Sequence, residues 1–302
     1  MSRPSTAFGA RNFTSQCHQD AWAYDNVFHP LLAAGATNDV AAPTFVEFGA
    51  RDGKRNSNSY FFEKSLGWRG LLVEAGSDDI AALRRNRHCI FNGKSSCLLG
   101  GVADDDGTIL HHKTYCTGAY RSCRAEERVI VSGTNVSAEL AARKGMTAVK
   151  SITLNGTLSA LGMTRVGLLS ADCEGCEWGA LSTFDFARWM PQLVVLELQA
   201  HGLAQKQAAT AKLKERLYSF GYHSLKTGTS NKDLDAYFIS DDVRHRLPPP
   251  CLDHLGCTAK SERSRRSSVP RGANSNTLDA KEHEHECLTR GEWVRVRPSV
   301  RP

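Results

Sequence analysis

The sequence lacks any apolar run close to the roughly 20 residues that a membrane-spanning helix needs. Residues 1–11 also lack the apolar centre of a secretory signal peptide. We therefore expect no membrane span and, by default, a cytoplasmic location. Ten cysteines in 302 residues are too dilute for a small disulfide-stapled scaffold. With 41% hydrophobic and 23% charged residues, the composition is that of an ordinary globular domain.

The first 242 residues lack a charge excess and are close to neutral, so most of the net charge of +6 lies in residues 243–302. This tail has a single aromatic residue, Trp293, and therefore lacks the interleaved basic and aromatic side chains typical of a nucleic-acid-binding segment. We expect a flexible lead-in over 1–14, one domain over 15–242, and a basic, Pro-, Ser- and Arg-rich disordered tail over 243–302.

Thr44–Gly53 combines a short apolar strand with a turn that contains two glycines, Gly49 and Gly53. A helix is expected directly afterwards, over Ser57–Leu66. A strand, a glycine turn and a helix N-terminus commonly hold nucleotide-like ligands, because the first N–H groups of a helix are unpaired. The turn has neither the G-x-G-x-x-G pattern nor the Gly-Lys-Ser/Thr of a phosphate loop. The pattern therefore disfavours nicotinamide and phosphate-loop sites.

Two further apolar strands are expected to end in acids. Gly70–Glu74 ends in Glu74, and Val166–Asp172 ends in Asp172. In a doubly wound sheet, an acid at the tip of the second strand can accept the hydroxyls of a ribose. Because the carboxyl ends of parallel strands meet at one edge of the sheet, these acids are expected at one ligand-binding edge.

Several segments in this order resemble the FkbM family of S-adenosylmethionine-dependent methyltransferases, which typically act on hydroxyl oxygens. They are Phe45–Gly53, Ser57-Asn58, Phe62–Glu74 and Leu169–Glu177. The resemblance runs from about Ser15 to about Ser240. It implies an α/β, Rossmann-like class I methyltransferase fold with a mostly parallel sheet. An antiparallel last strand is expected at Ala236–Ile239.

The resemblance also implies S-adenosylmethionine as cofactor and O-methylation of a sugar, glycan or small-molecule secondary metabolite. The chain departs from the family at Ala75-Gly76, where a proline commonly follows the acid, and at Asn155, where aspartate is frequent. Neither change removes a cofactor carboxylate. One alternative is a non-catalytic cofactor binder or scaffold whose basic tail recruits a partner. A nicotinamide oxidoreductase is disfavoured by the missing glycine fingerprint.

The cofactor is expected to lie across the tips of the first strands. The loop backbone would hold its methionine part, with Glu47 or Asp52 near the amino group, and Glu74 would bind the ribose. The adenine is expected beside Ala103 and Asp104. The full set of predicted cofactor residues is Glu47, Phe48, Gly49, Ala50, Asp52, Gly53, Asn58, Glu74, Ala75, Ala103 and Asp104.

Methyl transfer needs alignment and a group that removes the acceptor's proton. Asp172, Glu174 and His201 are the catalytic candidates. The first two lie at the carboxyl end of the Val166–Asp172 strand, and His201 follows another expected apolar strand, Leu193–Leu198. The alternatives are that Glu174 and Glu177 stabilise a helix N-terminus and that His201 is solvated. The polar stretch 113–150 is expected to be a lid that selects the acceptor, or else a surface insertion.

Cysteine spacing does not predict a metal site. Cys173-x-x-Cys176 has no second Cys-x-x-Cys pair, so we interpret both residues as small buried hydrophobes. Cys116 and Cys123 would form a disulfide only in an oxidising compartment. In the N-terminal segment, a helix is expected over Ser15–Ala34. There, two neighbouring polar residues, Gln19-Asp20, either pack beside the cofactor domain, as the resemblance implies, or are ordinary surface groups. The sequence does not specify the oligomeric state.

Overall fold

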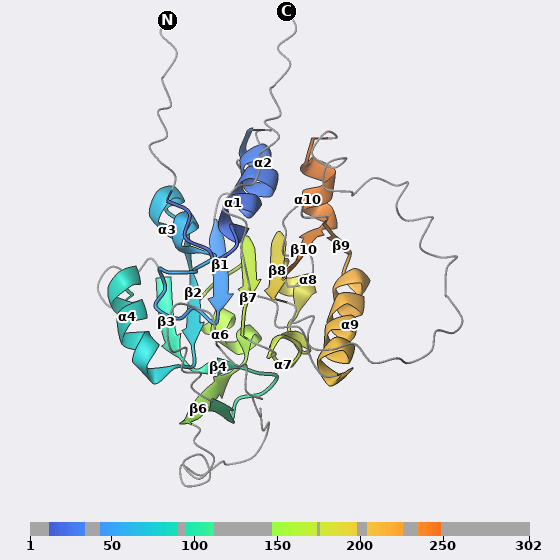
Figure 1. Cartoon of the computed structure of the whole chain (residues 1–302). Coiled ribbons are helices and arrows are strands. Elements are labelled where there is room, and N and C mark those ends of the chain that lie inside the picture. Colours follow the sequence, from blue (N-terminus) through green and yellow to red (C-terminus); the bar gives the residue numbers. More distant parts are fainter. Residues whose placement is uncertain are drawn as a thin grey trace, which may run out of the picture.

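The computed structural model describes residues 12–33, 43–89, 95–111, 147–173, 176–197, 204–225 and 235–248. Within them lies a seven-stranded sheet with strand order β3-β2-β1-β7-β8-β10-β9 (Figure 1). Its strands are β1 (Thr44–Phe48), β2 (Arg69–Glu74), β3 (Ser95–Leu99), β7 (Leu168–Ala171), β8 (Leu193–Glu197), β9 (Tyr222–Ser224) and β10 (Asp235–Ser240). A small sheet contains β4 (Gly101–Val102), β5 (Thr108–His111) and β6 (Thr147–Ile152).

The strand directions confirm the predicted fold class. Strands β3, β2, β1, β7 and β8 are parallel, whereas β10 is antiparallel to both β8 and β9. This is the Rossmann-like arrangement of class I methyltransferases. β10 is the last strand along the chain and is antiparallel, as expected, and β9 pairs with its outer side and forms the edge of the sheet. All five parallel strands therefore place their carboxyl ends at the same edge of the sheet.

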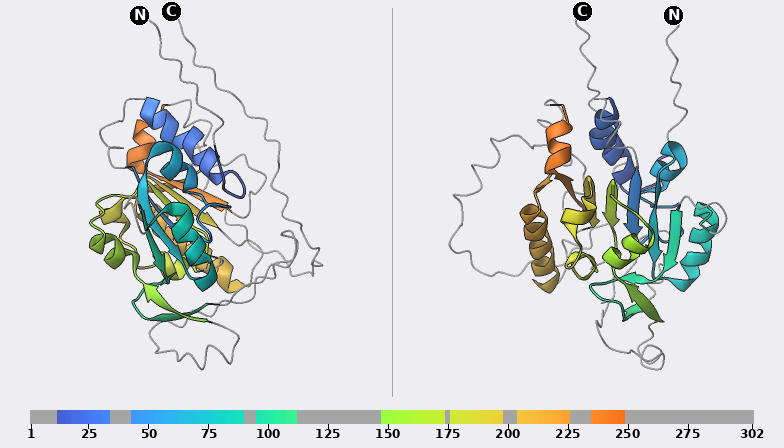
Figure 2. Two further views of the ribbon diagram at one scale, coloured as in Figure 1. Left: turned by 90° about the vertical axis from the view of Figure 1, so that its left-hand side faces the viewer. Right: turned by 180° about the vertical axis from the view of Figure 1, so that it is seen from behind.

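Helices cover both faces of the sheet (Figure 2). One face packs against α1 (Gln19–Ala23), the π-helix η1 (Tyr24–Phe28), α2 (His29–Ala33), α3 (Tyr60–Leu66), α4 (Ser77–Arg87) and α10 (Asp241–Arg246). The other face packs against α6 (Leu154–Ala160), α7 (Glu177–Leu181), α8 (Phe186–Trp189) and α9 (Ala204–Ser219). The apolar strands are buried from both sides, which explains why they read as continuous hydrophobic runs.

The N-terminal segment is helical, as expected, and buries its apolar residues Trp22, Val27, Phe28 and Leu31. Its polar pair is also buried, since Gln19 is 6% exposed and Asp20 1%. The alternative that these two residues are ordinary surface groups is therefore wrong.

Two local expectations are wrong for reasons of backbone chemistry. The sequence His88–Phe91 predicts a short third strand, but in its described part His88 adopts a left-handed conformation that ends α4. The third strand is β3, further along the chain. Ser77 is expected to cap the helix that follows β2, but it is the first residue of α4, and the extended Gly76 takes the capping position. The end of α3 is as expected, with Gly67 in the left-handed conformation.

The predicted domain boundaries fall partly beyond what the structure describes. Most of the expected lid lies outside the described residues, and residues 147–150 belong to β6. The expected start of the tail at residue 243 falls inside α10. Cys116 and Cys123 also lie outside the described residues.

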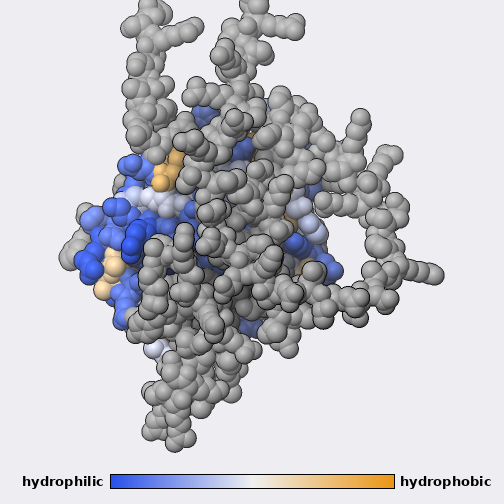
Figure 3. Space-filling view, viewed as in Figure 1, coloured by the Kyte–Doolittle hydropathy of each residue, from blue (hydrophilic) through white to orange (hydrophobic). Residues whose placement is uncertain are grey.

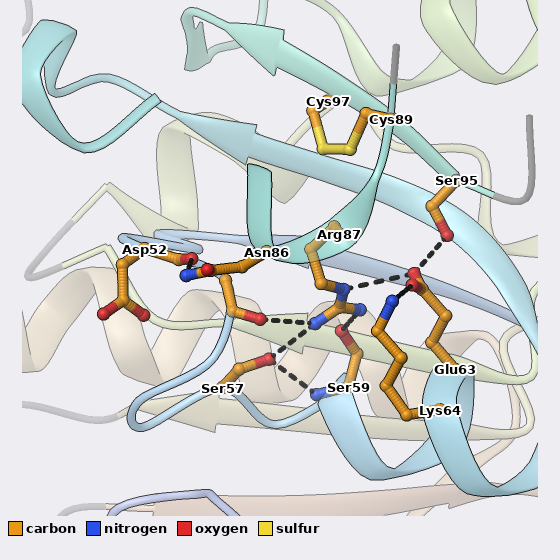
Figure 4. Close-up of a disulfide and its surroundings, with 11 residues drawn as sticks. Asp52, Ser57, Ser59, Glu63, Lys64, Asn86, Arg87, Cys89, Ser95 and Cys97 are labelled. Carbon is orange, nitrogen blue, oxygen red and sulfur yellow. Dashed lines mark hydrogen bonds and ion pairs between the residues drawn. A yellow bond between two sulfur atoms is a disulfide. The ribbon is translucent and has the colours of Figure 1, made fainter. Parts of the chain in front are cut away.

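Disulfides join Cys89 to Cys97 and Cys173 to Cys176. Burial of the second pair agrees with the interpretation as small hydrophobes, but the two sulfur atoms are bonded rather than separate thiols. The first pair, which the sequence did not single out, connects the end of α4 to β3 (Figure 4). Because disulfides persist mainly in oxidising compartments, these bonds do not support the expected cytoplasmic location.

On the face shown in Figure 3, the coloured surface around α4 is mainly hydrophilic. The large hydrophobic residues exposed among those described are Leu32, Leu99, Leu161, Met190, Tyr218 and Phe220. None of the described helices is long and apolar enough to cross a membrane.

Gly49, directly after β1, has no room for a side chain. Its φ of +80° lies in the left-handed region, and a Cβ built there would be 1.6 Å from the carbonyl oxygen of Asp172. Gly67 has a similar φ of +74°, yet a Cβ there would meet nothing within 4 Å. Substitutions at the two glycines therefore separate the cost of a left-handed backbone from the cost of the steric clash.

We predict that Gly67→Ala lowers the free energy of unfolding by about 1–2 kcal/mol, the usual strain of a left-handed residue. Gly49→Ala should lower it by more than about 4 kcal/mol, because β1 and β7 must also move apart. Urea unfolding monitored by circular dichroism measures both values. Equal losses for the two variants would show that the contact between Gly49 and Asp172 is not tight.

Candidate functional site

The loop between β1 and α3, residues 49–59, starts as a close extension of the sheet. The N–H groups of Gly49 and Ala50 both donate to the carbonyl of Val73, each at 3.1 Å. The N–H of Gly53 then donates to the carbonyl of Ala50 at 2.8 Å, which closes the turn. The predicted glycine turn is thus held against the end of β2, where Glu74 lies.

Glu47 fixes the far end of this loop from below. Its side chain is buried, and its carboxylate accepts hydrogen bonds from the N–H of Asn58 at 2.8 Å, from the Ser57 hydroxyl at 2.9 Å and from the Ser59 hydroxyl. Burial raises the pKa of Glu47, while the Arg87 charge and these hydrogen bonds oppose the rise. In this structure the Glu47 carboxylate supports the loop backbone.

Arg87, at the end of α4, holds the same loop from the side. Its guanidinium is fully buried, and Nη1 donates to the carbonyl of Gly53 at 2.8 Å and to the Ser57 hydroxyl at 3.1 Å. Nη2 donates to the Ser59 hydroxyl at 2.8 Å (Figure 4). Nε donates to Glu63 Oε2 at 3.1 Å. Every nitrogen of the guanidinium therefore has an acceptor, as a buried charge requires.

Glu63 is the countercharge of Arg87 and is itself nearly buried. It also accepts a hydrogen bond from the Ser95 hydroxyl at 2.5 Å and pairs with Lys64 Nζ at 3.0 Å. Burial raises the pKa of Glu63, but the Arg87 charge and the other partners outweigh burial, and the pKa is lowered. Glu63 is therefore an anion, and the pair connects α3, α4 and β3 beneath the loop.

The N-terminal segment holds the loop from a third side. The Thr14 hydroxyl donates to the carbonyl of Ser57 at 3.1 Å, and the N–H of Asn56 donates to the carbonyl of Thr14 at 2.9 Å. Asp20 fixes this segment by accepting from the N–H groups of Thr14 and Ser15, at 2.7 Å and 3.3 Å. This contact is the structural reason why Asp20 is buried.

Glu74 joins the loop to the tip of β2. Its Oε2 accepts from the N–H of Arg51 at 2.6 Å, and its Oε1 accepts from the N–H of Gly76 at 2.6 Å. The register pairs Phe48 with Val73, so the residues that follow them, Gly49 and Glu74, are neighbours across the two strand tips. The predicted cofactor acid and the predicted glycine turn therefore form one surface.

Asn58 carries an unpaired polar atom within the same region. Its side chain is 5% exposed, and its amide nitrogen donates to the Ser170 hydroxyl at 2.9 Å. Its Oδ1 has no hydrogen-bond partner among the described residues. A buried carbonyl oxygen of this kind calls for a donor. It fits a ligand with an ammonium group, as the expected sulfonium amino acid has.

The remaining predicted cofactor residues lie further from this centre or contribute only backbone. The side chain of Phe48 is in the core. The carboxylate of Asp52 turns back to the N–H groups of Lys54 and Arg55, at 2.9 Å and 2.8 Å. Partial burial raises the pKa of Asp52, but these bonds and the Arg55 side chain outweigh burial and lower the pKa. Ala75 follows Glu74 and is partly exposed.

The predicted adenine contacts follow β4. Ala103 is buried, and its N–H donates to the carbonyl of Ile152 at 3.1 Å. Asp104 is exposed. The chain reaches them from Gly100, whose N–H donates to the carbonyl of Glu74 at 2.9 Å. They therefore lie on the side of Glu74 away from the β1–α3 loop.

Five neighbouring strands contribute one row of residues along the carboxyl edge, which we call the edge row. Four members lie at the carboxyl end of their strand or one residue beyond, the fifth begins the antiparallel β10, and paired neighbours share a face of the sheet. The edge row is Glu74 (β2), Gly49 (β1), Asp172 (β7), Glu197 (β8) and Asp235 (β10). Four acids thus flank the single glycine.

The edge row contains one predicted catalytic residue, Asp172, which is partly exposed. Glu174 and His201 lie outside the described residues. The edge row also contains Asp235. Sequence reasoning missed this residue, because it begins a strand and belongs to no motif. Its carboxylate accepts from the Gln19 amide at 3.0 Å. Among the described residues, no group of three or more His, Cys, Asp or Glu is arranged to hold a metal ion.

We predict that Arg87→Met lowers the free energy of unfolding by about 3–5 kcal/mol, because it leaves the Glu63 carboxylate buried without its countercharge. Arg55→Met is the matched control. Arg55 pairs with Asp52 while its side chain is 77% exposed, so its loss should cost less than about 1 kcal/mol. Urea unfolding of both variants measures the two losses in the free energy of unfolding. A value for Arg87→Met close to that of the control would contradict the assigned role.

Comparison with solved structures finds chains with a similar arrangement at low identity. The METTL16 methyltransferase domain gives a TM-score of 0.39 at 10% identity and covers 73% of this chain, which spans 65% of that domain. Cofactor-bound Rv0187 from MTB gives a TM-score of 0.39 at 13% identity, and the match covers 76% of this chain and 82% of that chain. The Bacillus cereus O-methyltransferase in complex with SAH gives a TM-score of 0.36 at 9% identity, and the match covers 70% of this chain and 79% of that chain. Neither substrate nor mechanism follows from likenesses at this level.

No curated protein matches the sequence at a significant level. The model of the methyltransferase FkbM domain does match, over residues 47–224. This range begins at Glu47 and includes the β1–α3 loop, Glu74 and Asp172. The expected resemblance is thereby confirmed over more than half of the chain. The chain belongs to the FkbM methyltransferase family, and its cofactor is S-adenosylmethionine.

Proposed function

We propose that this chain transfers a methyl group from S-adenosylmethionine to a hydroxyl oxygen of a sugar or another small-molecule acceptor. The observation that carries the proposal is the hydrogen bond from the Arg51 N–H to Glu74 Oε2, at 2.6 Å. It brings the acid at the second strand tip against the glycine turn at the first. An acid in this position suits the hydroxyls of a ribose.

Different residues would bind different parts of the cofactor. Each oxygen of the Glu74 carboxylate has more than one lone pair, so it can accept ribose hydroxyls in addition to the two backbone N–H groups. Gly49 passes close to Asp172 after β7 and adds no side chain to the surface that would hold the methionine part. The Asn58 Oδ1 is positioned to accept a hydrogen bond from the amino group. Glu47 and Arg87 keep this loop in place.

The cofactor supplies a methyl group on a positively charged sulfur, whose leaving group is neutral. The chain must therefore align the acceptor and remove one proton. Asp172 follows β7, the strand that contacts Gly49, so it borders both the cofactor loop and the rest of the edge row. A carboxylate in this place favours an acceptor group that must lose a proton, such as a hydroxyl.

We predict that Glu74→Ala weakens binding of S-adenosylhomocysteine about 10- to 100-fold, because hydrogen bonds to a charged group contribute about 1.5–3 kcal/mol. Asp78→Ala removes an exposed acid from the start of α4 and should leave the affinity within about twofold. Isothermal titration calorimetry measures both, after unfolding curves show that the variants are folded. An unchanged affinity in Glu74→Ala would show that Glu74 does not bind the cofactor.

Turnover is tested separately by incubating the full chain with S-adenosylmethionine labelled in its methyl group and a panel of sugars, glycosides and phenols. We expect label in an ether product that mass spectrometry places on an acceptor oxygen. Cofactor binding without product across this panel would instead favour the non-catalytic binder.

A further inference from the structure

The Cys89–Cys97 disulfide completes a ring of contacts that contains the buried ion pair of Arg87 and Glu63 (Figure 4). Cys89 comes two residues after Arg87, the last residue of α4, and Cys97 comes two residues after Ser95, the first residue of β3. Arg87 Nε and the Ser95 hydroxyl both donate to Oε2 of Glu63, at 3.1 Å and 2.5 Å. The end of α4 and the start of β3 are therefore joined both covalently and through Glu63.

The last turn of α4 also supports the β1–α3 loop directly. Arg87 donates to three groups of that loop, and Asn86 Nδ2 donates to the carbonyl of Asp52 at 2.7 Å. Both residues lie within three positions of Cys89 along the chain. A displacement of this turn therefore changes the hydrogen bonds that hold the loop.

On its other side, the disulfide fixes this turn to the edge of the sheet. Cys97 is buried and pairs with Leu72 of β2, and β3 pairs with β2 alone among the described strands. Helix α4 ends at His88, which is exposed and left-handed. Because an edge strand has ladder hydrogen bonds on one side only, the disulfide adds a restraint where the backbone supplies few.

Of the two disulfides that the structure describes, this one has the more exposed cysteine. Cys89 is partly exposed, whereas Cys97, Cys173 and Cys176 are 8%, 6% and 8% exposed. Thiol–disulfide exchange requires an attacking thiolate to reach a disulfide sulfur, so access favours attack at Cys89. A dithiol is therefore expected to reach the Cys89–Cys97 bond first.

We propose that the Cys89–Cys97 disulfide positions the β1–α3 loop, and that its reduction by a dithiol weakens the binding of S-adenosylmethionine. This inference rests on the proposed binding of the cofactor by that loop. In the reduction, one thiolate of the dithiol attacks the Cys89 sulfur, the S–S bond breaks, and Cys97 leaves as a thiolate. The second thiol of the reductant then displaces Cys89. The reductant gives up two electrons and becomes a disulfide, and its two protons end on Cys89 and Cys97.

Reduction leaves Arg87 its acceptors but removes the covalent restraint on the turn that carries it. The loop can then adopt more conformations before the cofactor binds, so that binding must overcome a larger loss of entropy. Linkage makes the effect reciprocal, because a ligand that binds the oxidised chain more tightly must also favour the disulfide by the same factor.

The first test measures the affinity of the full chain for S-adenosylhomocysteine by calorimetry, oxidised and after reduction with dithiothreitol. We expect reduction to weaken binding about 5- to 50-fold, as is usual for two coupled sites. Cys89→Ala/Cys97→Ala should bind as weakly as the reduced chain and should not respond to the reductant. Cys173→Ala/Cys176→Ala removes the other disulfide, and as the matched control it should still respond.

The second test measures the reciprocal effect. The chain is equilibrated in mixtures of reduced and oxidised dithiothreitol, and alkylation followed by peptide mass spectrometry gives the reduced fraction of Cys89 and Cys97. Saturating S-adenosylhomocysteine should raise the ratio of reduced to oxidised dithiothreitol at half-reduction by the same factor that calorimetry gives. A disulfide that only stabilises the fold would give the same ratio with and without ligand.

The inference is overturned if reduction leaves the affinity within about twofold, or if the ratio at half-reduction does not shift. It is also overturned if Cys89→Ala/Cys97→Ala still responds to dithiothreitol or if the control variant does not.

If the oxidised chain does not bind S-adenosylhomocysteine, the proposed function fails first. Amide hydrogen exchange without ligand then still tests the positioning role. Reduction should speed exchange at residues 49–59, and unchanged exchange there would contradict the role.

Discussion

The buried charge of Arg87 is the constraint on which the cofactor side of the molecule depends. A guanidinium without water must have an acceptor for each nitrogen, and here the acceptors are Glu63, the hydroxyls of Ser57 and Ser59, and the carbonyl of Gly53. All but one of these belong to the β1–α3 loop. A loop that would otherwise change shape is therefore fixed as part of the core before any ligand arrives, which lowers the entropy that binding must overcome.

The same type of side chain serves different purposes at this edge because its surroundings differ. Glu47 is enclosed by donors and supports the loop, and Glu63 balances a buried cation. Glu74 bridges two strand tips through backbone N–H groups. Asp235 is partly exposed, and burial together with the nearby charge of Asp172 raises its pKa to about 7. The functional assignments follow from hydrogen-bond partners and burial rather than from residue identity.

The sequence predicted the elements whose signal is local and missed those that depend on distant partners. Apolar runs located β1, β2, β7 and β8, and the glycine turn and Glu74 followed from spacing alone. β3 was misplaced, because its Ser95-Ser96 start looks polar, although Ser95 is buried beside Glu63. The Arg87 contacts and the edge row join segments far apart in the chain, so no short motif reports them. Asp235 became visible only through the pairing of β10 with β8.

The most direct measurement of the central claim is amide hydrogen exchange with and without S-adenosylhomocysteine. If the loop held by Arg87 binds the cofactor together with Glu74, exchange should slow at residues 49–59 and 74–76 when the ligand is added. Exchange in α6, on the opposite face of the sheet, should not change. Binding that leaves the loop and the β2 tip unprotected, with slower exchange only elsewhere, would contradict the claim.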